Sequence, residues 1–226
     1  VQQAPASGSI PLAAELQART RVLTGFWKAV AIAFGSSAIL LALNQLLNLG
    51  FFVGEVLLDT AYLYALAALL VSMVFLFVPA TKGAARDHVP WYDAVLFVAS
   101  VGVFFYFAFN SFRIISEAWE FMSPPTAVAV STVGWLLLLE ATRRSGGTAV
   151  FVVVGLVSLY PVYAELMPGP IAGLGQDLYT TMAYHFTSSE SVLGIPMRAF
   201  GELVIGFVMF GAVLQFTGAS EFFNNL

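Results

Sequence analysis

Few residues of this sequence could do chemistry, and two pairs of them border or interrupt long apolar runs. Arg143 and Arg144 follow four leucines and precede Ser-Gly-Gly, so they could bind an anion or mark one side of a membrane. Arg198 and Glu202 are four residues apart, so one helix face would carry both, as an ion pair or as a polar contact. Ionisable residues inside a membrane span are costly and are functional candidates by default. Arg198 and Glu202 are therefore our candidates for a substrate-binding contact.

The sequence lacks the familiar catalytic motifs. It has no His-Glu-x-x-His run, no Gly-x-Ser-x-Gly turn and no Gly-x-x-x-x-Gly-Lys loop. It contains no cysteine and only His88 and His185 as histidines, which excludes thiol catalysis and a cysteine- or histidine-rich metal centre. We therefore expect neither an enzyme, nor a catalytic residue, nor a resident metal or cofactor.

Composition indicates the class of protein. The 226 residues are 59% hydrophobic and 10% charged, and their mean hydropathy is +0.87. A soluble domain is about 25% charged, so these charges are too few to cover a water-exposed surface. The net charge of −4 comes without a basic cluster, which argues against nucleic acid as a partner. The prediction is an integral membrane protein whose partner is the lipid bilayer.

Six apolar stretches are long enough, or nearly so, to cross a hydrocarbon core of about 30 Å as helices. Backbone groups in lipid must form hydrogen bonds within their own segment, which favours helices. The predicted spans are approximately 28–49, 57–79, 92–115, 125–140, 147–166 and 196–217. The sequence thus predicts an all-α, polytopic helical bundle with about six transmembrane helices.

The distribution of cations predicts the orientation of the bundle. Cytoplasmic loops collect Lys and Arg, and alternating the sides of the spans places seven of the nine cations together. These topology anchors are Arg19, Arg21, Lys28, Lys82, Arg86, Arg143 and Arg144. We expect the N terminus and the Arg143–Arg144 turn to be cytoplasmic. The alternative of an anion site at the two adjacent arginines stays open.

Two segments outside the spans are also expected to be helical. Residues 9–23 have leucines on one side and arginines near the other, which predicts a short interfacial helix at the N terminus. Residues 171–193 are more polar than any span. Within them Leu174, Leu178 and Met182 recur every four residues, which favours a helix lying on the external face.

The order of several short motifs resembles that of a known family. The motifs are LLEATRR at 138–144, GIP at 194–196, FVMFGAVL at 207–214 and TGASEFF at 217–223. This series, between residues 136 and 226, is similar to the fused membrane permeases of tripartite ATP-independent periplasmic (TRAP) transporters, in particular the TAXI branch. The preceding residues resemble the family only in their topology.

The resemblance implies the uptake of organic acids by secondary active transport across a bacterial or archaeal cell membrane. An extracytoplasmic substrate-binding protein would deliver the acid, and symport with sodium or protons would drive uptake, with the coupling-ion site outside this chain. The implied regions are the interfacial helix at 1–23, a four-helix small-subunit-like (Q-type) scaffold at 24–145, and the first helices of the large (M-type) permease region at 146–226. The remaining large region would be a partner.

An alternative is a stand-alone six-helix membrane scaffold or accessory subunit without its own transport path. The resemblance favours a chain that is mainly the scaffold part of a transporter. Neither interpretation reveals the transported substrate.

The orientation can be tested by tagging the Arg143–Arg144 turn and treating intact cells with a membrane-impermeant reagent. Because cations retain this turn on the cytoplasmic side, we expect protection in intact cells and labelling only after the membrane is permeabilised. Ready labelling from outside would contradict the predicted topology.

Overall fold

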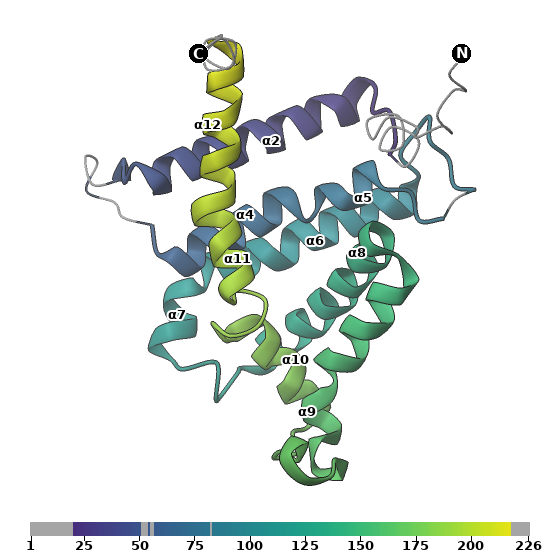
Figure 1. Cartoon of the computed structure of the whole chain (residues 1–226), viewed down its shortest axis with the longest axis vertical. Coiled ribbons are helices and arrows are strands. Elements are labelled where there is room, and N and C mark those ends of the chain that lie inside the picture. Colours follow the sequence, from purple (N-terminus) through teal and green to yellow (C-terminus); the bar gives the residue numbers. More distant parts are fainter. Residues whose placement is uncertain (1–19, 51–53, 55–56, 82, 218–226) are drawn as a thin grey trace, which may run out of the picture.

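The computed structural model describes residues 20–50, 54, 57–81 and 83–217, and over these residues it is helical without a strand. The longer elements are α2 (Gly25–Leu46), α4 (Asp59–Leu70), α6 (Trp91–Phe109), α8 (Pro125–Ser158), α10 (Leu178–Thr187) and α12 (Ile205–Phe216). The shorter ones are α5 (Met73–Phe77), α7 (Ser111–Ser116), α9 (Tyr160–Tyr163), η1 (Ala164–Leu166), η2 (Gly169–Ile171), α11 (Ile195–Ala199) and η3 (Phe200–Val204). Figure 1 shows their arrangement. The predicted all-α class is confirmed.

Among the described residues, five helices are long and apolar enough to cross a membrane. They are α2, α4 with α5 (Asp59–Phe77), α6, α8, and the continuous run Ile195–Phe216 formed by α11, η3 and α12. The sequence predicted about six spans because it counted 125–140 and 147–166 separately. Both of these stretches begin within the single long element α8, which ends at Ser158, and α9 and η1 continue the second stretch to Leu166.

Gly147 folds α8 back on itself. Its φ of 82° and ψ of 175° are non-helical values that only glycine adopts readily, so the helix axis reverses there. The two arms lie beside each other in Figure 1, and the Trp135 indole donates to the Ser158 hydroxyl at 3.0 Å across them. The predicted turn after Arg143 and Arg144 is therefore present as a helical hairpin.

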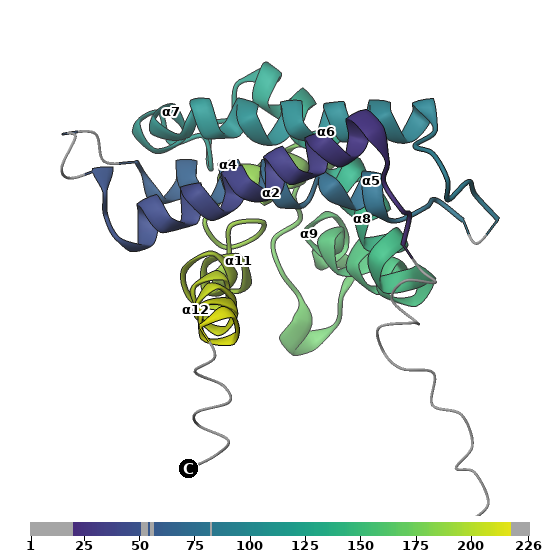
Figure 2. The same cartoon turned by 90° about the horizontal axis from the view of Figure 1, so that it is seen from above.

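Helix α4 is the centre of the bundle. Over an 18-residue stretch of the span that α4 forms with α5, 61% of the residues are buried, compared with 11% in α2 and 6% in Ile195–Phe216 over stretches of the same length. Its residues are apolar on every side, as expected for a helix surrounded by others, and it packs against α6 and α2. Figure 2 shows α2, α4 and α6 alongside one another, with α11 and α12 set apart from them.

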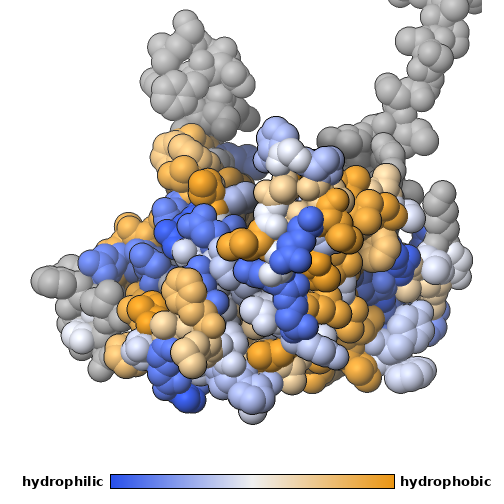
Figure 3. Space-filling view, turned by 90° about the horizontal axis from the view of Figure 1, so that it is seen from below, coloured by the Kyte–Doolittle hydropathy of each residue, from blue (hydrophilic) through white to orange (hydrophobic). Residues whose placement is uncertain are grey.

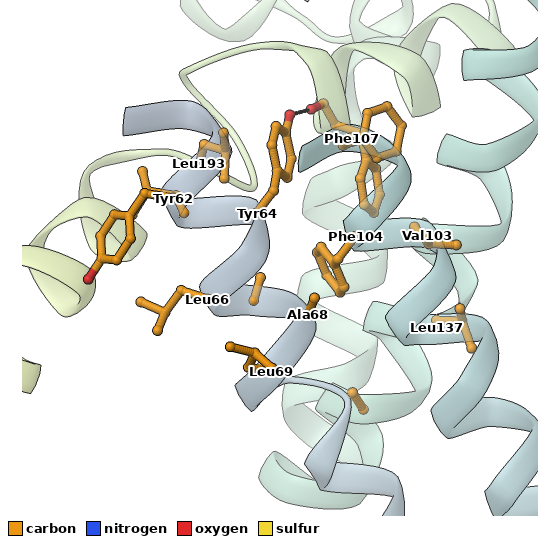
Figure 4. Close-up of a cluster of buried hydrophobic side chains, with 14 of the residues drawn as sticks. Tyr62, Tyr64, Leu66, Ala68, Leu69, Val103, Phe104, Phe107, Leu137 and Leu193 are labelled. Carbon is orange, nitrogen blue, oxygen red and sulfur yellow. Dashed lines mark hydrogen bonds between the residues drawn. The ribbon is translucent and has the colours of Figure 1, made fainter. Parts of the chain in front are cut away.

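Helix α10 inserts an aromatic side chain into this core. Phe186 stacks on Phe107 with ring centroids 5.2 Å apart, and its backbone carbonyl accepts a hydrogen bond from the Tyr64 hydroxyl. Figure 4 shows Tyr64 and Phe107 in this core. The helix predicted for 171–193 therefore needs two corrections. It begins only at Leu178, where the Asp177 carboxylate caps it, and one of its faces is buried in the protein.

The predicted N-terminal helix at 9–23 falls mostly outside the described residues. Residues 20–23, which are described, are not helical. The Arg21 backbone N–H donates at 2.8 Å to the carbonyl of Phe77, the last residue of α5. The local helical pattern fails there because this backbone is bonded to a distant part of the chain.

Gly134 on α8 makes close packing against Phe186 possible, so Gly134→Ala is expected to destabilise the fold. An added Cβ would lie 2.4 Å from the Phe186 Cζ and 2.8 Å from the Val103 Cγ1. Overpacking of this kind costs about 1–3 kcal/mol, which should lower the thermal unfolding midpoint of the purified protein in detergent. Gly102→Ala on α6 is the matched control, because its Cβ would meet nothing within 4 Å. Equal midpoints for the two variants would contradict this packing.

Candidate functional site

A buried carboxylate lies where the fold of α8 meets α6. Asp93, in the first turn of α6, is fully buried and has two arginine partners. The Arg21 Nη2 lies 2.5 Å from its Oδ2, and the Arg144 Nη1 lies 2.7 Å from its Oδ1. The side chains of Arg21 and Arg144 are 0% and 1% exposed. Charges buried this deeply are stable only when they are paired and hydrogen-bonded.

Glu140 joins Arg21, Asp93 and Arg144 to a further charged residue of α8, Arg143. It accepts from the Arg144 Nε at 2.8 Å and from Arg143 at 2.7 Å, one helical turn along α8. We call Arg21, Asp93, Glu140, Arg143 and Arg144 the ionic cluster. Its members come from three separate parts of the chain, so the cluster fastens these parts together.

The arginines of the ionic cluster also satisfy backbone carbonyls at the end of α5. Arg21 donates to the Phe75 carbonyl at 3.1 Å, and Arg144 donates to the Val78 carbonyl at 3.2 Å. The last carbonyls of a helix have no partner within it and carry a partial negative charge. Guanidinium groups are suited to this position because they supply both donors and positive charge. The cluster is thus a cap as well as a set of ion pairs.

The other predicted anchors are distributed around the same end of the bundle. Arg143 donates to the Ala80 carbonyl and Arg21 to the Ala85 carbonyl, so the three predicted cationic segments meet. Lys28 and Arg86 are exposed, whereas Arg19 and Lys82 lie outside the described residues. The role of these cations in topology stays a prediction. What the sequence interpretation missed is that Arg21 and Arg144 are buried and paired with Asp93.

Arg198 and Glu202 lie on one continuous helical run, but they do not form an ion pair with each other. A π-helical turn, η3, covers Phe200–Val204 between them. Its i→i+5 hydrogen bonds widen the helix locally. The Tyr62 hydroxyl donates to the Gly201 carbonyl at 2.7 Å within this turn, and thereby joins it to α4.

Arg198 instead lines a cavity of about 320 Å³ beside α4 and α7. Glu120, Thr60 and Ser189 line the same cavity, and Glu202 does not. Figure 3 shows that hydrophilic patches interrupt the apolar surface of the molecule when it is seen from below. A substrate contact for Arg198 and Glu202 stays a prediction. Of the two residues, Arg198 lines the cavity and Glu202 does not.

An exposed ion pair near this cavity contrasts with the ionic cluster. Arg113 donates to Glu117 at 2.9 Å at the end of α7, and both side chains are about half exposed. Hydrogen bonds from Arg113 and from the Trp119 indole lower the pKa of Glu117 below its usual value. Such an exposed pair contributes little to stability, so it is a useful reference for the buried one.

These features define a polytopic helical membrane protein whose helices are fastened at one end by buried ion pairs. Residues 133–226 match the family model described as the tripartite ATP-independent periplasmic transporter, DctM component. This similarity supports a TRAP-type membrane permease component, and the matched family is one of transporters and not of enzymes. No curated protein and no solved structure matches the chain.

Replacing Asp93 with asparagine should strongly destabilise the protein. The change leaves Arg21 and Arg144 buried without their carboxylate, and breaking a buried pair costs about 3–5 kcal/mol. We expect a large drop in the thermal unfolding midpoint and a loss of monodisperse protein in detergent.

Glu117→Gln is the matched control, because it also removes an arginine's partner but at an exposed position. It should leave the unfolding midpoint unchanged. A midpoint for Asp93→Asn as high as that of Glu117→Gln would show that the ionic cluster does not stabilise the fold.

Proposed function

We propose that this chain is a membrane component of a TRAP-type transporter and contributes mainly its scaffold. The observation that carries the proposal is the match of residues 133–226 to the DctM component, in a chain with five candidate membrane-spanning helices. The match begins within the first arm of α8 and includes α10 and the run from α11 to α12. The large-component similarity therefore starts on an arm that packs into the N-terminal bundle.

The packing of the helices supports a scaffold role for the N-terminal part. Helices α2, α4 and α6 and the first arm of α8 share one hydrophobic core, and the ionic cluster fastens their ends. In contrast, no described residue of α12 is buried. This difference is expected if the N-terminal helices form a fixed scaffold and α12 packs mainly against other parts of the transporter.

The finer proposal follows the motif resemblance to the TAXI branch. The transporter would take up an organic acid delivered by an extracytoplasmic binding protein, across a bacterial or archaeal cell membrane. Sodium or protons would drive the uptake as symport, and the coupling-ion site would lie in the remaining large region, which completes the transport path.

Uptake by membrane vesicles tests this function. Vesicles should contain the natural full-length permease and be supplied with a candidate extracytoplasmic binding protein from the same organism and a panel of radiolabelled organic acids. We expect accumulation of at least one acid that requires both proteins and an imposed ion gradient. Collapse by a sodium ionophore or by a protonophore would identify the coupling ion, and ATP depletion should have no effect while the gradient is maintained.

Two results would contradict the proposal. Accumulation that does not depend on the binding protein would exclude a TRAP-type mechanism. Failure of every acid, together with co-purification of a second membrane polypeptide in fixed ratio, would favour an accessory scaffold instead. Vesicles without the permease are the control for binding and leakage.

A further inference from the structure

The cavity that Arg198 lines is bordered by three parts of the chain. Thr60 and Tyr64 come from α4, Ile114 and Glu120 from α7 and the turn after it, and Ser189 and Arg198 from the segment that joins α10 to α11 and from α11 itself. We call this cavity of about 320 Å³ the Arg198 pocket. A volume of this size is at the lower end of the range for small-molecule sites.

Two polar groups of the Arg198 pocket have no partner within the described part of the chain. Arg198 is exposed, and no hydrogen bond or ion pair is formed by its guanidinium. The Thr60 hydroxyl oxygen is buried and also lacks a hydrogen bond. A buried polar atom without a partner is uncommon in native structures and points to a group that supplies one. Both side chains can donate to a carboxylate.

A negative charge shares the pocket with Arg198. The Glu120 carboxylate accepts one hydrogen bond, from the Ser188 hydroxyl at 3.0 Å, and its remaining acceptor sites are unused by described residues. Glu120 and Arg198 are on different elements and do not form an ion pair, although they line the same cavity. The pocket therefore presents one cation and one anion that do not neutralise each other directly.

We propose that the Arg198 pocket binds a small zwitterion, namely an amino acid. Its carboxylate pairs with Arg198 and accepts from the Thr60 hydroxyl, and its ammonium group pairs with Glu120. A simple carboxylate pairs with Arg198 but is repelled by Glu120. An amine without a carboxylate pairs with Glu120 but is repelled by Arg198. Only a ligand that carries both charges matches both walls. This selection combines attraction and repulsion, as specific sites commonly do.

The proposal concerns binding and does not rest on the proposed transport function. It assigns Arg198 a ligand contact with Glu120 in place of Glu202, which does not line the pocket. Because binding can be measured without a gradient or a binding protein, failure of one proposal can be told apart from failure of the other.

Three matched probes test the site on the full-length protein in lipid nanodiscs. L-alanine carries both charges, L-lactate replaces the ammonium with a hydroxyl, and isopropylamine replaces the carboxylate with a methyl group. Saturation-transfer NMR titrations would give the three dissociation constants. We expect L-alanine to bind about tenfold or more tightly than either of the other probes, since each of these leaves one wall of the pocket unpaired.

Variants assign the contacts. Arg198→Gln should weaken L-alanine by about tenfold or more, and Glu120→Gln should abolish the preference for L-alanine over L-lactate. Arg113→Gln is the matched control, because Arg113 is an exposed arginine near the pocket that does not line it. It should leave all three dissociation constants unchanged. Thermal midpoints equal to that of the parent protein would show that Arg198→Gln and Glu120→Gln are folded.

The proposal is overturned by any of three results. They are no binding of L-alanine, equal affinities for L-alanine and L-lactate in the parent protein, or unchanged L-alanine affinity in a folded Arg198→Gln variant. Equal affinities would identify a site for carboxylates alone.

Discussion

Asp93 places a negative charge inside the bundle, and two arginines from distant parts of the chain neutralise it. Arg21 precedes the first described helix, and Arg144 lies just before the fold in α8, so the pairing of all three side chains fixes how these segments meet. The desolvation of such charges is expensive, and their mutual attraction offsets it only in part. Arg21 donates a hydrogen bond to the Asp93 Oδ2, whereas the contact of Arg144 with the Oδ1 is an ion pair without a hydrogen bond. The contribution of the ionic cluster is therefore mainly to specify one arrangement of the helices.

This constraint explains the order of burial in the bundle. Arg21 and Arg144 both donate to carbonyls at the end of α5, which places the α4–α5 span between the N-terminal segment and α8. Helix α4 is consequently enclosed, and its aromatic and aliphatic side chains meet α6 on one side and α10 on another. The run Ile195–Phe216 has no such fastening. It touches α2 along η3 and α12, and α4 at Gly201, where an added Cβ would come within 2.9 Å of the Leu63 Cδ2.

The spans could be predicted from the sequence because their length and apolar character are set by the lipid and not by neighbouring helices. The predicted starts at 57, 92 and 196 lie within two residues of Asp59, Trp91 and Ile195. The clustering of cations at one end followed from the same reasoning. Asp177 is a typical helix-capping residue, so the late start of α10 was also readable from the sequence.

The pairings between helices were not predictable in this way. The spacing of Asp93 from Arg144 in the sequence carries no information until α6 and α8 are known to adjoin, so their pairing was not predicted. Arg198 and Glu202 do not form the ion pair that their spacing allows. Arg198 lines a cavity with residues of α4 and α7, and the Tyr62 hydroxyl on α4 bonds to the π turn. In both cases a tertiary contact, which no local pattern encodes, decides the outcome.

Arg144 and Arg198 show how the same side chain acquires different roles from its surroundings. Arg144 is buried, and its guanidinium contacts two carboxylates and a backbone carbonyl, so a ligand from solvent does not reach it. Arg198 is exposed beside a cavity and contacts none of the described acids. The adjacent arginines at 143 and 144 were the more conspicuous candidates for an anion site in the sequence. Arg198 is exposed and its guanidinium has no partner among the described residues, so it can reach a ligand that the buried Arg144 cannot.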